Sequence, residues 1–167
     1  MKKPVVVAVS CGFDPVHIGH VRMFQETKKL GDELVVILNN DHWLTDKKGA
    51  PFMPEEERRE IIEAIVGVDR VVITGHVPGD SDRSVCRTLQ EIKPHIFANG
   101  GDRKPDGDPV PEVSLCNELG IEVVYNVGAG GGKYNLLLGS SRRQQRRLPT
   151  RKSNETSCVR RWGAYNT

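Results

Sequence analysis

Two patterns of apolar residues alternate along the chain. Short continuous apolar runs are typical of strands buried on both faces, and apolar residues recurring every three to four positions are typical of amphipathic helices. The runs predict strands at residues 4–10, 33–40, 70–75, 95–101 and 121–128. The periodic segments predict helices at residues 20–31, 54–67, 84–93 and 111–120. This alternation predicts an α/β fold, a Rossmann-like parallel sheet of five strands with helices on both faces.

Ligands of such sheets bind beyond the carboxyl ends of the strands. The segments that follow the predicted strands hold most of the glycines, the histidines and the unpaired acids, although loops in general are polar and rich in glycine. These segments are "CGFDPVHIGH", "NNDHWLTDKKGAPF", "TGHVPGDSD", "NGGDRKPDGDP" and "NVGAGGGK".

Length and composition narrow the class of protein. A chain of 167 residues suits one α/β domain. The apolar start, "MKKPVVVAV", is followed by no small-residue cleavage site, and no run approaches the roughly 18 apolar residues of a membrane span. The four cysteines form no CxxC pair, which favours reduced thiols over a disulfide framework or a zinc site. We therefore expect a cytoplasmic protein without a membrane partner or a resident metal.

Charge divides the chain into two parts. Residues 140–167 hold eight Lys or Arg and one acid, a net charge of +7. The other 139 residues hold 16 basic and 21 acidic side chains, a net charge of −5. This break predicts a domain over residues 1–133 and a basic, disordered tail over residues 134–167.

The segment "GFDPVHIGH" at residues 12–20 carries the clearest chemistry. Gly12 permits a tight exit from the first strand, and Gly19 lets a phosphate approach the backbone because it has no Cβ. The following helix presents free N–H groups and the positive end of its dipole to the strand terminus. His17 and His20 lie one helical turn apart, where two cationic or hydrogen-bonding imidazoles would bind phosphate and stabilise the charge of a breaking triphosphate. The alternatives are that both are polar residues of the first turn, or that this HxxH pair holds a divalent ion.

The motif resembles the HxGH signature of the nucleotidyltransferase superfamily, in its cytidylyltransferase-like branch. That branch includes glycerol-3-phosphate and ethanolamine-phosphate cytidylyltransferases and heptose 1-phosphate adenylyltransferases. The resemblance extends over residues 5–133, through the segments "KKLGDELVVILNND", "KKGAPFMPEEERREIIEAIVGVDRVV" and "KPHIFANGGDRKP". It implies transfer of a nucleotidyl group, CMP or AMP, from CTP or ATP to a small phosphate monoester with release of pyrophosphate, normally with Mg²⁺.

The resemblance also implies roles for individual residues. His17, His20 and Lys48 would be catalytic, with Lys47 the near alternative to Lys48 as a mobile-loop lysine that reaches the α-phosphate. Arg58 would contact phosphate from its helix. The residues implied around the nucleotide are Gly12, Phe13, Asp14, Gly19, Arg58, Gly101 and Asp102.

Each of these roles has a plainer alternative. Lys47 and Lys48 could belong to a solvated loop, and Asp102 could be a turn residue. Arg58 could pair with Glu55 on its own helix. With the residues in these roles, the expected mechanism is in-line displacement at the α-phosphorus without a protein nucleophile.

Other classes of function fit less well. The string "HIGH" also marks class I aminoacyl-tRNA synthetases, but those need a KMSKS-like loop and a longer chain. "GAGGGK" is one residue short of a P-loop, and Tyr134 stands where a Ser or Thr should bind Mg²⁺. The basic tail would also suit a nucleotide-sensing protein or a nucleic-acid binder, and this alternative stays open, although we expect no nucleic-acid partner. A homodimer is common in the family, and the sequence does not test it.

The chain departs from the family after the fifth strand, where a Ser/Thr-rich stretch should bind the triphosphate. "GGGK" is followed instead by "YNLLLGSSRRQQRR". Residues 133–139 can be encoded as AAA TAC AAT CTT CTT CTT GGN, and the frame that starts at the last A of the lysine codon reads Ile-Gln-Ser-Ser-Ser-Trp. We interpret residues 134–167 as an out-of-frame tail, with a natural basic extension as the alternative. In either case activity could be impaired.

Overall fold

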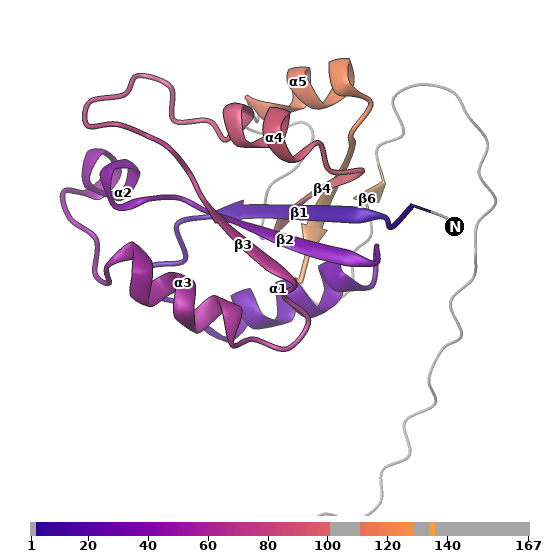
Figure 1. Cartoon of the computed structure of the whole chain (residues 1–167), viewed down its shortest axis with the longest axis horizontal. Helices are drawn as coiled ribbons and strands as arrows, with labels where there is room; N and C mark the ends of the chain where they lie inside the picture. The colour runs from indigo at the N-terminus through magenta and orange to yellow at the C-terminus, as the bar shows by residue number, and fades with distance from the viewer. Residues whose placement is uncertain (1–2, 101–110, 129–133, 136–167) are drawn as a thin grey trace, which may run out of the picture.

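The computed structural model describes residues 3–100, 111–128 and 134–135. Eleven helices and strands lie in these ranges, and they include the alternating strands and helices that the apolar pattern predicts, with α2 and β6 in addition (Figure 1). They are β1 (Val6–Cys11), α1 (Ile18–Lys28), β2 (Glu33–Leu38), α2 (Asp41–Lys48), α3 (Glu55–Glu63), β3 (Arg70–Ile73), α4 (Cys86–Ile92), β4 (Ile96–Gly100), α5 (Glu112–Leu119), β5 (Glu122–Val127) and β6 (Tyr134–Asn135).

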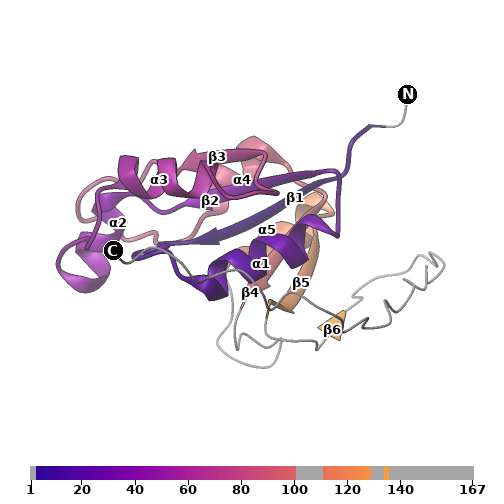
Figure 2. The same cartoon turned by 90° about the horizontal axis from the view of Figure 1, so that it is seen from below.

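The strands form one sheet in the order β3-β2-β1-β4-β5-β6 (Figure 2). Strands β1 to β5 pair in parallel, which confirms the predicted five-stranded parallel sheet. The short β6 pairs antiparallel with β5 at the edge of the sheet. The strand order reverses between β1 and β4, and in a doubly wound sheet such a switch point opens a crevice at the carboxyl ends.

Helices cover both faces of the sheet, as predicted. One core cluster packs Met23 and Phe24 of α1 and Ile62 of α3 against the sheet. The other packs Leu89 of α4 and Cys116 of α5 against the opposite face. Figure 1 shows α1 and α3 on one side of the strands and α4 and α5 on the other. Two covered faces explain why β1 and β2 are almost continuously apolar.

Helix α2 lies in a segment that the apolar pattern left as a loop. Its signals are local: the Asn40 side chain accepts a hydrogen bond from Trp43 N at 3.0 Å, and Lys47 and Lys48 lie in the last turn. Gly49 ends the helix with φ of 94°. An N-cap, basic last turn and C-terminal glycine together indicate a helix, although only Leu44 of its side chains is buried.

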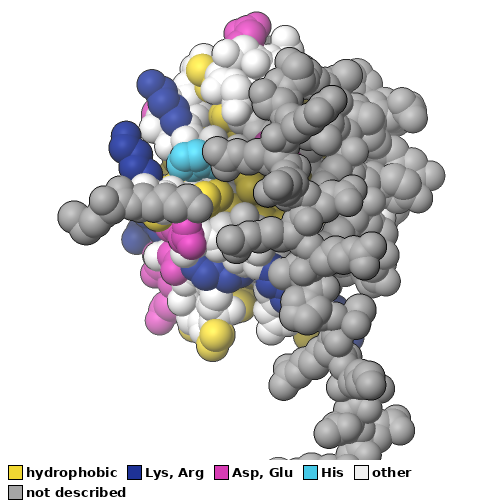
Figure 3. Space-filling model, turned by 90° about the vertical axis from the view of Figure 1, so that its right-hand side faces the viewer, with side chains coloured by type: hydrophobic (Ala, Val, Ile, Leu, Met, Phe, Trp, Pro, Cys, Tyr) yellow, Lys and Arg dark blue, Asp and Glu magenta, His cyan; other side chains and the backbone are white. Residues whose placement is uncertain are grey.

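The amino-terminal side of the sheet is a mixed-charge surface. Charged side chains of both signs lie close together on this side of the molecule (Figure 3). Lys28 at the end of α1 pairs with Asp69, and Arg70 pairs with Glu33 at the starts of β3 and β2. None of the described helices combines the length and the apolar character that crossing a bilayer requires.

Candidate active site

A cavity of about 350 Å³ opens at the carboxyl ends of β1, β4 and β5, next to the start of α1. It therefore lies at the switch point of the sheet, where the topology predicts a ligand site. Residues of four elements and of the loops between them line it: Ser10, Cys11, His17, Gly19, His20, Met23, Asn99, Gly100, Val127 and Gly128.

His17 and His20 lie together at the start of α1 and hold each other in place. His17 Nδ1 accepts a hydrogen bond from Gly19 N at 3.1 Å, and His20 Nδ1 accepts one from His17 N at 3.2 Å. The rings stack with centroids 3.7 Å apart. Because both Nδ1 atoms are acceptors, the neutral rings carry their protons on Nε2. Two Nε2–H donors therefore remain for a ligand in the cavity.

Phe13 supports His20 from its other side. The two rings meet edge to face with centroids 5.0 Å apart, and Phe13 is 1% exposed. Burial first, and the neighbouring His17 second, lower the pKa of His20 to about 4. His20 is therefore neutral at physiological pH. Of the two roles that the sequence left open, cation or hydrogen-bond donor, this favours the donor. The predicted nucleotide-contacting residue Phe13 is instead packed beneath the imidazole.

The two glycines of the motif differ from expectation in what they permit. At the exit of β1 it is Phe13 that has a left-handed backbone, with φ of 48°. Gly12 itself does not have a positive φ. A Cβ on Gly19 would lie 2.8 Å from Cε1 of His17. Gly19 thus makes room for the imidazole ring of the same chain, which is a different reason for glycine from the predicted approach of a phosphate.

Asp14 anchors the loop that follows α2. Its Oδ1 accepts a hydrogen bond from Met53 N at 2.8 Å, and its Oδ2 accepts one from Phe52 N at 2.7 Å. Lys48 Nζ forms an ion pair with Oδ2 at 2.6 Å. Burial would raise the pKa of Asp14, but these hydrogen bonds outweigh it and hold the pKa below its ordinary value.

The two adjacent lysines point to different partners. Lys48 contacts Asp14 of the histidine motif, and its side chain is 39% exposed. Lys47 Nζ lies 4.4 Å from the ring centroid of Trp43 in a cation–π contact. Of the two, Lys48 is the one that the structure brings to the motif.

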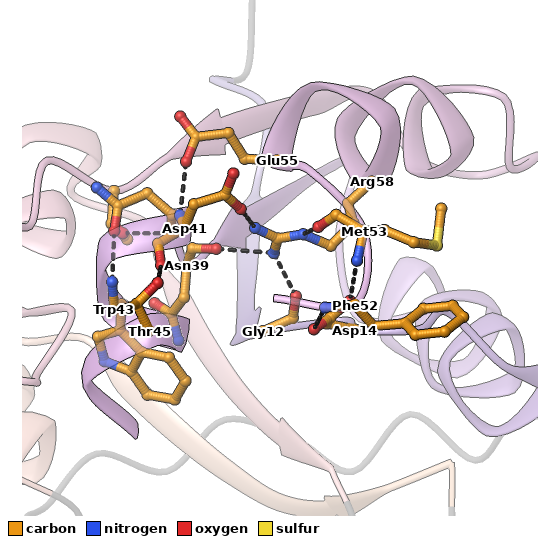
Figure 4. A network of polar contacts seen from close by, with 12 residues as sticks. Gly12, Asp14, Asn39, Asp41, Trp43, Thr45, Phe52, Met53, Glu55 and Arg58 are labelled. Carbon is orange, nitrogen blue, oxygen red and sulfur yellow. Dashed lines mark hydrogen bonds and ion pairs between the residues drawn. The ribbon is translucent and has the colours of Figure 1, made fainter. Parts of the chain in front are cut away.

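Arg58 has a different position from the predicted phosphate contact. Its side chain is fully buried, and its guanidinium donates to the carbonyl oxygens of Gly12 at 2.6 Å, Asn39 at 2.8 Å and Met53 at 2.9 Å. It also pairs with Asp41 Oδ1 at 2.6 Å (Figure 4). The alternative partner, Glu55, accepts instead from Asp41 N. Arg58 therefore acts as a buried clamp that joins the ends of β1 and β2 to the starts of α2 and α3.

Two predicted site residues, Gly101 and Asp102, lie outside the described residues. The role predicted for them stays a prediction, and so does the boundary between the domain and the tail at residue 134. Sequence reasoning also missed a residue of the cavity wall, Asn99. It follows the buried Ala98 at the end of β4, and its polar character next to a buried run was the available signal.

The side chains near the histidines bear on the Mg²⁺ that the resemblance implies. No group of three or more His, Cys, Asp or Glu side chains comes together in the described part of the chain. Both carboxylate oxygens of Asp14 already accept hydrogen bonds. The Mg²⁺ implied by the resemblance stays a prediction.

Known proteins share this architecture. The model of the cytidylyltransferase-like family matches residues 11–122. The FAD synthase of Archaeoglobus fulgidus is 38% identical over 112 residues, which cover 67% of this chain and 77% of that enzyme. The FAD synthase of Ferroglobus placidus is 37% identical over 124 residues, 74% of this chain and 75% of the relative.

Two further likenesses extend the comparison. The bifunctional protein HldE of Desulfatibacillum aliphaticivorans is 34% identical over 124 residues, 73% of this chain but 24% of HldE. A crystal structure of a lipopolysaccharide core biosynthesis protein from Thermoplasma volcanium superimposes with a TM-score of 0.61 at 32% identity, covering 80% of this chain and all of that one. The histidine motif at a switch-point cavity and these matches agree, and the chain belongs to the cytidylyltransferase-like family of nucleotidyltransferases.

Proposed function

We propose that this chain transfers AMP from ATP to a small phosphate monoester and releases pyrophosphate. The observation that carries the proposal is that His17 and His20 line the switch-point cavity at the start of α1, with each Nδ1 already bonded to the backbone, so that the Nε2 of each ring is left for a ligand. Relatives named FAD synthase favour ATP over CTP, since FAD is FMN joined to AMP. FMN is accordingly the first acceptor to test.

In the proposed reaction, a phosphate oxygen of the acceptor attacks the α-phosphorus of ATP, and the bond to pyrophosphate breaks. Negative charge accumulates on the leaving oxygens. His17 and His20 donate hydrogen bonds to them, and the start of α1 adds the positive end of the helix dipole. His20 does this as a neutral donor, because its pKa is about 4. Mg²⁺ is expected to arrive on the triphosphate.

Lys48 supplies the positive charge in this proposal. In the structure it is paired with Asp14, 2.6 Å away, at the end of α2. Its partly exposed side chain would exchange this carboxylate for the α-phosphate when ATP binds. Asp14 would keep its two backbone hydrogen bonds to Phe52 and Met53, so the loop would stay in place.

The test is an assay of pyrophosphate release with ATP or CTP against a panel of phosphate monoesters, including FMN, glycerol 3-phosphate and sugar 1-phosphates. The proposal predicts release that needs both ATP and one monoester, with a product of the mass expected for an AMP-linked diphosphate. Preference for CTP would correct the nucleotide, and release without an acceptor would indicate a pyrophosphohydrolase instead.

A further inference from the structure

The side chain of Asn99 is a polar group of the cavity wall without a partner. Asn99 is 6% exposed, and its Nδ2 is shielded from solvent and has no hydrogen-bond partner. Buried amide groups are nearly always hydrogen-bonded, so an orphan that lines a cavity is a candidate ligand contact. The pairing of β4 with β5 also becomes irregular here, because Ala98 pairs with Val124 but Gly100 with Val127. The extra residue lies on β5, so β4 keeps its alternation through Asn99, and bulges of this kind are common next to active sites.

Strand alternation places Asn99 on the face of the sheet that carries α4 and α5. On β4, Phe97 packs in the cluster of that face and Ala98 in the cluster of the opposite face. On β1, Ala8 packs on the α4–α5 face, so Ser10 follows it there. Ser10 and Asn99 both line the cavity, one residue beyond the paired positions Val9 and Ala98. Ser10 and Asn99 therefore form a neutral polar pair at the carboxyl edge of the sheet, on the face opposite to α1.

In an in-line displacement the attacking oxygen and the leaving oxygen lie on opposite sides of the α-phosphorus, and therefore on opposite sides of the cavity. In the proposed reaction the leaving pyrophosphate lies at His17 and His20, which are at the start of α1. The attacking phosphate must approach the α-phosphorus from the opposite side, which is the side of Ser10 and Asn99. We propose that Asn99 is a specificity-determining residue that donates a hydrogen bond to the phosphate of the acceptor. This inference rests on the proposed function.

The amide can present its donor to the cavity at small cost. A half-turn about the last side-chain torsion exchanges the nitrogen and the oxygen of an asparagine. No described residue hydrogen-bonds to the Asn99 side chain, so that turn breaks no existing hydrogen bond. A phosphate monoester offers only acceptors on its dianion, so it would select the orientation in which Nδ2 points into the cavity.

The experiment compares Asn99→Leu and Asn99→Asp with the wild-type chain and with Asn117→Leu. Asn117 lies on the exposed face of α5 and is no part of the cavity wall, so Asn117→Leu is a matched control. Apparent KM values for ATP and for the monoester that the wild-type chain accepts are measured by pyrophosphate release. Thermal melting shows whether each variant folds.

We expect Asn99→Leu to raise the KM of the monoester roughly tenfold and to leave the KM of ATP within about twofold. Asn99→Asp should raise the monoester KM further, because a carboxylate would face the phosphate. Unchanged values, or a rise confined to ATP, would overturn the inference while the proposed function stands. Absence of turnover in the wild-type chain with every monoester would overturn both.

Discussion

The imidazole of His20 is enclosed between two rings, with His17 stacked 3.7 Å away and Phe13 edge-on at 5.0 Å. This enclosure, together with the hydrogen bond that each Nδ1 accepts, fixes the orientation of both histidines before any ligand binds. Preorganised donors stabilise developing charge without reorganising during the reaction. The arrangement therefore links the packing of the first loop to the chemistry proposed for it.

Replacing His17 by Asn should separate its structural role from its chemical one. Asn is a good N-cap residue, so the start of α1 should keep its cap, while the Nε2–H donor is lost. We expect turnover to fall roughly 100-fold or more, with an unfolding free energy within about 0.5 kcal/mol of wild type. Steady-state kinetics and urea denaturation measure the two effects. Retained turnover in the folded variant would contradict the role of His17.

Stability should depend on pH through His20. Its pKa is about 4 in the folded chain and about 6.5 when unfolded, so the unfolded state binds more protons between these values. The stabilisation is fully present above pH 6.5 and is lost as pH falls towards 4, at about 1.4 kcal/mol per pH unit. Urea titrations of wild type and His20→Asn test this. Equal slopes for both proteins between pH 6.5 and 4.5 would rule it out.

The buried clamp formed by Arg58 should matter for stability. Arg58→Met leaves three backbone carbonyls and Asp41 without their shared donor, so we expect a loss of about 3 kcal/mol or more. Arg59→Met is the matched control, since Arg59 is exposed and pairs with Glu63 and Glu56 on its own helix. Its loss should stay within about 0.5 kcal/mol. If Arg58→Met instead stayed stable and only weakened ATP binding, the phosphate contact implied by the family would hold.

Lys48 and Lys47 provide an internal comparison of two neighbouring charges. Lys48→Met should lower kcat roughly 100-fold, because the charge proposed for the α-phosphate is lost. Lys47→Met should change kcat less than about threefold, because Lys47 lies on the ring of Trp43. Both variants keep most of the length of the side chain and remove only its charged end. A larger loss with Lys47→Met would reverse the assignment.

The interpretation of residues 134–167 makes a prediction at the level of the gene. The alternative frame at codon 134 should continue with a serine-rich segment, and a frame-restored chain should bind ATP more tightly than this one. Nucleotide sequencing and ATP titration of the two chains measure these outcomes. A gene without a serine-rich alternative frame would favour the natural basic extension.

The strands were the most predictable part of the fold, because each is a continuous apolar run buried on both faces. Helix α2 was missed since it buries only Leu44, so its apolar periodicity is weak and its capping residues carry the signal. The helix predicted over residues 20–31 also ends earlier than predicted, because α1 ends at Lys28. Gly31 lies beyond the C-cap Lys29, and a Cβ there would lie 2.6 Å from the carbonyl oxygen of Val5. The spacing of residues along the sequence does not show that the chain at Gly31 lies close to the chain at Val5.

The site was predictable where it is local and not where it depends on tertiary contacts. His17 and His20 occur in one motif, and the structure brings them together as the spacing predicts. The four partners of Arg58 come from three separate segments, and no sequence pattern distinguishes a buried arginine from a surface one. The side-chain amide of Asn99 is notable because its buried Nδ2 has no hydrogen-bond partner, and only the structure shows this.

The most direct test of nucleotidyl transfer at the histidine cavity is the stoichiometry of the reaction. With ATP and an accepted phosphate monoester, the wild-type chain should release one pyrophosphate for each monoester consumed, and His17→Asn should lose most of this turnover while remaining folded. Pyrophosphate release unrelated to monoester consumption, or equal turnover by wild type and His17→Asn, would contradict the account.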